Sequence, residues 1–299
     1  LALHNYHQVM DTFPMGSSRA ISTMPTYPGW GDWSAQAMML PYLEQQPVYN
    51  AINFYYTATG NVTDMSLNVN STAYNTKINS FLCPSDGNAG RSNFNSYYGS
   101  VGTTTNVYYN GQTTGLFALA MSNSIASVSD GTSTTIAFSE SLTGDNNGAS
   151  QYRGNGVRGV SLTGYQLADV FQTIPAGMQA PGITIPAGLS TCSTSFQSGS
   201  NLTSNKGARW GAGTLGFTLF TTVVPPNASQ YKWGACGIGG SGGGADASTF
   251  VNAQSNHSGG SNVLMADGSV KFIKDSVSWM TWWSLGTKAN GEVISSDSY

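Results

Sequence analysis

The stretch SNVLMADGSVKFI, residues 261–273, decides the fold class of this chain. Two short apolar runs flank Asp267-Gly268, and the glycine of such a dipeptide adopts the positive φ that a tight hairpin turn requires. We therefore predict a β-hairpin over these residues. His257 precedes the hairpin, so its imidazole either hydrogen-bonds across the strands and fixes their register or lies in an exposed loop.

Further strands are predicted upstream, because several segments rich in aromatic and β-branched residues lie between Gly and Asn turns. These segments are SYYGSV (96–101), GLFAL (115–119), TTIAFSE (134–140), GVSL (159–162) and TLGFTLFTTVV (214–224). The closing EVISSDSY (292–299) is expected to add a last strand. Together with the hairpin, these segments favour an antiparallel sheet.

Helical spacing marks three other regions. LALHNYHQVMD (1–11) has apolar residues at helical intervals and no capping residue before them, which predicts the end of a helix that begins outside this sequence. WSAQAMMLPYLEQQPVYNAINF (33–54) is interrupted by Pro41 and Pro47 and predicts two or three short helices. SVSWMTWWSLGT (276–287) predicts a helix that ends at Gly286, with Val277, Met280, Trp283 and Leu285 on one face. The expected fold class is α+β.

The composition is poor in charge. Charged residues make up 8% of the chain, against about 25% in an ordinary soluble domain, and the formal net charge is −3. With 11 scattered Lys and Arg residues there is no basic stripe to bind a phosphate backbone, so nucleic acid is not an expected partner. A neutral polar surface is common in exported proteins and permits close packing between subunits.

The three cysteines are Cys83, Cys192 and Cys236. They form no C-x-x-C motif and have no histidine nearby in sequence, which argues against a zinc site. We favour a disulfide between Cys192 and Cys236, because both lie in Gly/Ser-rich sequence where a crosslink offsets a weak local core. Cys83 is then either buried as a small apolar residue or bonded outside this sequence. Three free thiols are the alternative.

Motifs for catalysis are weak. G-x-G-x-x-G occurs at Gly154 and Gly211, and G-x-S-x-G surrounds Ser241, but glycine is so abundant that chance explains them. His4 and His7 share a helical face without a third ligand. We expect no catalytic residue, no metal ligand set and no cofactor, although calcium at the Asp-rich loops stays open.

Several segments in the same order resemble one family: LALHNYH, LPYLEQQPVYNAINF, FLCPSD, SDGTSTTIAFSE, NHSGGSNVLMADGSVKFIKDS and GEVISSDSY. This is the planctomycete-type prepilin-like family of unknown function, which has a C-terminal His-x9-Asp-Gly motif. The resemblance implies that His257, Asp267 and Gly268 define the fold. It also implies a pilin-like N-terminal helix, truncated here and packed on an antiparallel sheet. A cysteine on the missing part of that helix is, by the same resemblance, the candidate partner of Cys83.

The resemblance further implies export through the inner membrane and assembly at the cell surface. We expect residues 1–12 to end the pilin-like helix and residues 13–299 to form one β-rich head, with a loop-rich insertion at about 144–250. The leading hypothesis is a non-enzymatic structural subunit of an extracellular pilus-like filament or secretion pseudopilus. Its partners are copies of itself and the export and assembly machinery.

Two other hypotheses belong to different classes. A carbohydrate-binding or adhesion module would bind glycans through exposed aromatic side chains, for which Trp30, Trp33, Trp210 and Trp233 are the candidates. A hydrolase is the least supported, because the Ser, His and Asp residues show no arrangement in sequence.

Overall fold

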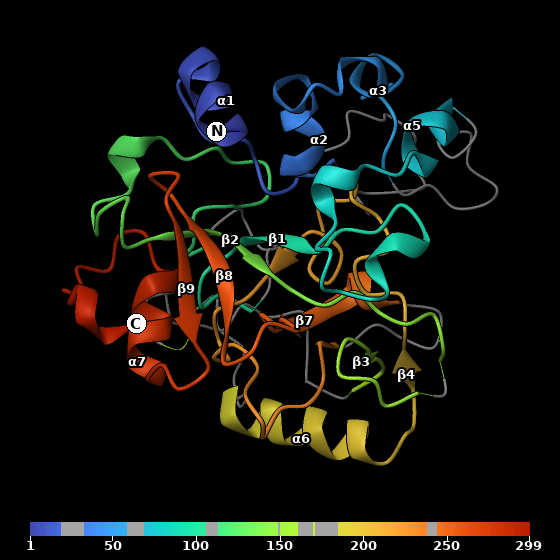
Figure 1. Ribbon diagram of the computed structural model, residues 1–299, viewed down its shortest axis with the longest axis vertical. Helices are drawn as coiled ribbons and strands as arrows, with labels where there is room; N and C mark the ends of the chain where they lie inside the picture. The colour runs from blue at the N-terminus through green and yellow to red at the C-terminus, as the bar shows by residue number, and fades with distance from the viewer. Residues whose placement is uncertain are drawn as a thin grey trace.

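The computed structural model describes residues 1–18, 33–58, 69–105, 113–148, 150–160, 170, 185–237 and 244–299. Their fold is built on two β-sheets with short helices around them (Figure 1). The N-terminal helices lie along one end of the molecule, and α6 (Ile185–Gln197) lies at the opposite end (Figure 1). The α+β class predicted from the sequence is therefore correct.

The larger sheet has five strands in the order β5-β1-β2-β8-β9. They are β5 (Leu219–Phe220), β1 (Tyr97–Ser100), β2 (Ile136–Glu140), β8 (Gly260–Met265) and β9 (Val270–Lys274). Strands β8 and β9 form the predicted hairpin, and Gly268 in its turn has φ 88°. The turn dipeptide and the apolar runs on either side of it are neighbours in sequence, so this hairpin could be predicted from the local sequence.

The second sheet has four strands in the order β4-β3-β6-β7. They are β4 (Leu202–Thr203), β3 (Gly156–Val157), β6 (Ala235–Gly237) and β7 (Ser248–Val251). The pairs β1–β5 and β3–β6 are parallel, so the expectation of one antiparallel sheet was wrong. Parallel partners need long crossover connections, and a local pattern of residues does not specify which distant strand pairs with which.

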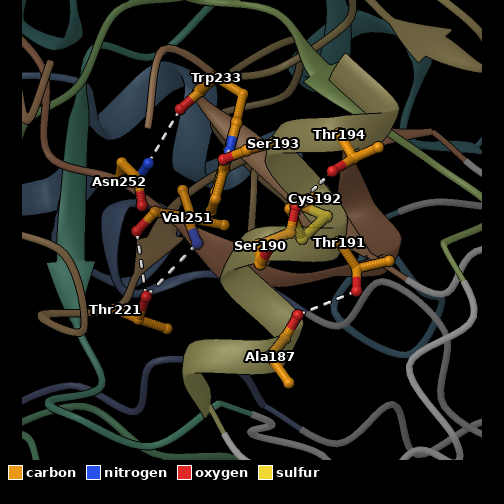
Figure 2. The surroundings of a disulfide bond; sticks show 11 residues. Ala187, Ser190, Thr191, Cys192, Ser193, Thr194, Thr221, Trp233, Val251 and Asn252 are labelled. Carbon is orange, nitrogen blue, oxygen red and sulfur yellow. Dashed lines mark hydrogen bonds between the residues drawn. A yellow bond between two sulfur atoms is a disulfide. The ribbon is translucent and has the colours of Figure 1, made fainter. Parts of the chain in front are cut away.

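The described residues within 144–250, the range predicted as a loop-rich insertion, include several strands and a helix. They contribute strands β3, β4 and β6 and all but the last residue of β7 to the second sheet, strand β5 to the first sheet, and helix α6. Cys192 on α6 and Cys236 on β6 form a disulfide (Figure 2), the pair favoured from the sequence. The bond lies in a core that includes Trp233 and Phe250, so its surroundings are better packed than the Gly/Ser-rich sequence suggested. The Gly-rich tract at 238–243 lies outside the described residues.

The N-terminal segment forms helix α1 (Ala2–Met10), which ends at Asp11 in the left-handed conformation, and Phe13 beyond it is fully buried. Three short helices follow where two or three were predicted: α2 (Ala35–Met39), η1 (Leu40–Leu43) and α3 (Gln46–Asn50). The remaining short helices are α5 (Ser71–Asn75), η2 (Asn79–Phe81), η3 (Ala89–Arg91), η4 (Ile125–Ser127), η6 (Ala245–Ala247) and η7 (Ser296–Ser298). No helix among the described residues is long and apolar enough to span a membrane.

Helix α7 (Trp279–Gly286) is present, and its buried face agrees with the prediction only in part. Val277 and Leu285 are buried as predicted, whereas Met280 is 58% exposed. Trp282, which was not predicted on this face, is fully buried. The helix is apolar nearly all round, so periodicity does not single out the face that packs. Its orientation is set by neighbours, since the Trp283 indole donates to the backbone carbonyl of Val223 and Gly286 lies against Thr222.

Three predicted strands are missing or reduced. GLFAL (115–119) forms an isolated bridge between Leu119 and Ser17 instead of a strand. TLGFTLFTTVV (214–224) contains the two-residue β5, and EVISSDSY (292–299) ends in η7 rather than in a strand. Strand β3 precedes the predicted GVSL, whose residues 161–162 lie outside the described part of the chain.

Candidate functional site

Three side chains that are far apart in the sequence meet beside the five-stranded sheet. Glu140 is the last residue of β2, Cys83 lies in the loop between η2 and η3, and His257 lies between β7 and β8. The two loops are joined by a hydrogen bond of 2.9 Å from the Asn256 side-chain amide to the backbone carbonyl of Ser85. Strand pairing and this loop contact therefore place the three side chains together.

The three side chains converge on one point. His257 Nε2 lies 3.2 Å from Glu140 Oε1 and 4.0 Å from Cys83 Sγ, and Sγ lies 3.5 Å from the same carboxylate oxygen. The Ser85 hydroxyl lies 3.0 Å from Sγ and 3.3 Å from Nε2. One imidazole nitrogen thus faces a thiol, a carboxylate and a hydroxyl at once.

The carboxylate of Glu140 is held by the neighbouring strand. Its second oxygen, Oε2, accepts hydrogen bonds from the backbone N–H of Asn262 at 2.9 Å and from the Asn262 side-chain amide at 3.3 Å. Asn262 lies on β8, which pairs directly with β2. Oε1 is therefore left to face His257 and Cys83, as expected where an outer residue orients a ligand or a reacting group.

The site is buried on the side of Cys83 and Glu140, where the dielectric is low, and it is open to solvent on the side of His257. Cys83 and Glu140 are each 6% exposed, whereas the side chain of His257 is 36% exposed. Tyr97, opposite Glu140 on β1, has its pKa raised to about 12, first by burial and then by the charges of Cys83 and Glu140. The imidazole of His257 is therefore the solvent-exposed part of the cluster.

The arrangement does not suit a nucleophilic relay. In a Cys-His-acid triad one imidazole nitrogen faces the thiol and the other faces the carboxylate, which orients the ring. Here the same nitrogen, Nε2, faces both groups. Among the described residues, Cys83, Glu140 and His257 are the one group of His, Cys, Asp or Glu residues whose donor atoms lie close enough together to hold a metal ion.

A comparison with family models places the chain. The family described as protein of unknown function (DUF1559) matches residues 1–278. The chain belongs to the DUF1559 family. No curated protein and no solved structure matches it. The matched region includes Cys83, Glu140 and His257, so the cluster lies inside the part of this DUF1559 protein that the family model covers.

The His-x9-Asp-Gly residues of this DUF1559 protein do not lie in one site. His257 lies in the loop before β8 and bonds to Glu140 of β2 rather than across the hairpin, so of the two alternatives the loop position is the one observed. Asp267 lies beyond the other end of β8, where its carboxylate accepts from the backbone and hydroxyl of Ser269. Gly268 lies against His4 of α1. The motif therefore marks two separate places, one at each end of β8.

The sequence did not predict that Cys83, Glu140 and His257 form one cluster. A zinc site at Cys83 was not expected, because no histidine is near it in sequence. In the fold, however, Cys83 contacts His257, which is 174 residues away along the chain. Each residue lies in a segment that carried the family resemblance: FLCPSD, TTIAFSE and NHSGGSN. Their joint appearance in those segments was the available signal.

The aromatic residues expected to bind sugars are mostly in the core of this DUF1559 protein. Trp33, Trp210 and Trp233 are at most 1% exposed, so their rings cannot stack on a ligand. Trp30 lies outside the described residues. A cleft of about 700 Å³ does lie beside α6, lined by amide side chains and by Arg153 and Tyr231. The three buried tryptophans thus correct the basis of the glycan-binding hypothesis.

Proposed function

We propose that this DUF1559 protein is a non-enzymatic structural subunit of an extracellular pilus-like filament or secretion pseudopilus. The resemblance to the planctomycete-type prepilin-like family supports this role. So does the disulfide between Cys192 and Cys236, because such bonds persist in oxidising compartments outside the cytosol. The subunit is exported through the inner membrane, works at the cell surface and has copies of itself as its main partners.

The observation that carries the proposal is an edge of the five-stranded sheet that pairs with no further strand among the described residues. Strand β9 is the edge strand, and on its outer face Val270 is 67% exposed and Phe272 is 44% exposed. Natural proteins usually guard such an edge with charged side chains, since unpaired backbone groups recruit another strand. On β9 the exposed Lys274 is the one charge on the face of Val270 and Phe272, because Lys271 donates to the Tyr299 hydroxyl and to the Ser133 carbonyl.

An edge of this kind suits strand addition between subunits. Backbone hydrogen bonds would supply affinity, and the exposed apolar side chains would supply part of the specificity. Only 8% of the chain is charged, so little like-charge repulsion opposes close packing of copies. Copies of the subunit could therefore assemble through β9, a strand of the head domain itself.

The test is assembly of the exported protein in its source organism. Electron microscopy is expected to show helical filaments that contain this chain, and Val270→Asp is expected to abolish them while the melting temperature of the subunit stays unchanged. Val293→Asp is the matched control, because Val293 is fully exposed and lies in no strand. A protein that stays monomeric at the cell surface, or a Val270→Asp variant that still assembles, contradicts the proposal.

A further inference from the structure

We propose that Cys83, Glu140 and His257 bind one zinc ion, a function independent of assembly. The observation behind it is that a thiol, a carboxylate and an imidazole present one donor atom each within 4.8 Å of one another. Sulfur, nitrogen and oxygen in one small site is the donor set that Zn²⁺ takes in proteins. Calcium does not fit, because it takes oxygen ligands only.

The distances between the donors match a tetrahedral ion. Zinc bonds of about 2.3 Å to sulfur and about 2.0 Å to nitrogen or oxygen place neighbouring tetrahedral ligands roughly 3.3–3.6 Å apart. The structure has 3.2 Å between His257 Nε2 and Glu140 Oε1, 3.5 Å between Oε1 and Cys83 Sγ, and 4.0 Å between Sγ and Nε2. Small side-chain adjustments bring all three to bonding distance.

A cavity beside the cluster can hold a fourth ligand. A cavity of about 10 Å³ lies against Cys83, Ser85 and Glu140, about the volume that one water requires. Ser96 lines the same cavity, and its buried hydroxyl has no hydrogen-bond partner among the described residues. Since buried polar groups are normally satisfied, this hydroxyl indicates a missing polar occupant. A water in this cavity would bond to it and would be the candidate for the fourth zinc ligand.

The surrounding residues fit a metal site as well. Asn262 fixes the orientation of the Glu140 carboxylate, and such outer contacts usually accompany metal ligands. Cys83 is unpaired although the protein contains a disulfide, so a reason for keeping its thiol is needed. Zinc takes the thiolate, and binding therefore releases the thiol proton to the buffer.

Metal titration of the whole chain tests the proposal, with the Cys192–Cys236 disulfide intact and Cys83 kept as its thiol. After chelator treatment and gel filtration, Zn²⁺ added alone is expected to bind at one ion per chain, measured by calorimetry and elemental analysis. Co²⁺ is expected to give a thiolate-to-cobalt charge-transfer band, which reports on Cys83 directly. Absence of bound Zn²⁺ overturns the proposal, as does peptide mapping that finds Cys83 of the native protein in a disulfide.

Variants locate the ion. His257→Gln and Cys83→Ser are each expected to weaken Zn²⁺ binding by more than the roughly 10–100-fold that loss of an outer residue causes, and Asn262→Ala to weaken it within that range. His7→Gln is the matched control, because His7 lies on α1 and touches Ile125. Near-ultraviolet circular dichroism without metal checks that each variant is folded. Undiminished binding by folded His257→Gln contradicts the assignment.

Discussion

At the scale of single residues, Lys206 makes stability depend on pH. Its side chain is fully buried, and Nζ donates to the Leu142 carbonyl at 2.6 Å and to the Ser141 hydroxyl at 2.5 Å. Burial lowers the pKa of Lys206 from 10.5 to about 7. Between these two values the unfolded chain holds a proton that the folded chain has released. The free energy of unfolding is therefore expected to rise with pH over this window.

The size of this rise is measurable by denaturant unfolding at several pH values. Each pKa unit corresponds to about 1.4 kcal/mol, so a shift of this size contributes up to several kcal/mol. Lys206→Met is expected to flatten the rise, although Lys288, whose pKa burial lowers to about 8, keeps part of it. Lys274→Met, at an exposed position, is the control and should keep the full slope. An equal slope in both variants would assign the effect to other groups.

Residues in the candidate site show why sequence alone fell short. The hairpin turn at Asp267-Gly268 depends on neighbours in sequence and could be predicted, as could the stop after α1. The contact of Cys83 with His257 depends on where β2, β8 and two loops meet, which no local pattern encodes. Burial of Lys206 is of the same kind, because nothing in its sequence neighbourhood is apolar enough to suggest it.

At the scale of elements, the disulfide joins α6 to β6 across 44 residues of chain (Figure 2). Closing a loop of that length restricts the unfolded chain and contributes roughly 4 kcal/mol in the chain-entropy model. Replacing both Cys192 and Cys236 by Ser is expected to lower the free energy of unfolding by an amount of that order, measured by chemical denaturation. The control Cys83→Ser, in chelator, leaves this bond intact. A loss below 1 kcal/mol, about the effect of an ordinary substitution, would contradict the expectation.

Helices and strands differed in how far the sequence could specify them. The breaks at Pro41 and Pro47 correctly divided the segment after residue 33 into short helices. Helix α7 was predicted, but only part of its buried face, because tertiary contacts to Phe220 and Val223 determine which of several apolar sides packs. GLFAL has the composition of a strand, yet Phe117 and its neighbours pack in the core without a full ladder partner.

At the scale of the whole molecule, the two sheets are parts of one structure. Strand β5 comes from residues 144–250 but pairs with β1 in the five-stranded sheet. Two backbone hydrogen bonds hold it there, from Gly99 to Thr218 at 2.7 Å and from Val101 to Phe220 at 3.1 Å. The backbone N–H of Thr221 then donates to Val251 of β7 in the second sheet. The segment therefore contributes to both sheets; the sequence predicted a strand at 214–224 within it, but not that this strand pairs with β1.

This dependence can be tested by deletion. Replacing residues 144–250 with a short Gly/Ser linker removes Leu219 and Phe220, which are fully buried against the first sheet. The remainder is expected to lose cooperative thermal unfolding and to bind a hydrophobic dye, because its core is open. The control inserts the same linker at Gly148, which is exposed and has open space around it, without removing any residue. A deletion variant that melts cooperatively with a native near-ultraviolet spectrum would instead mean that the first sheet folds without β5 and that the segment is a separable insertion.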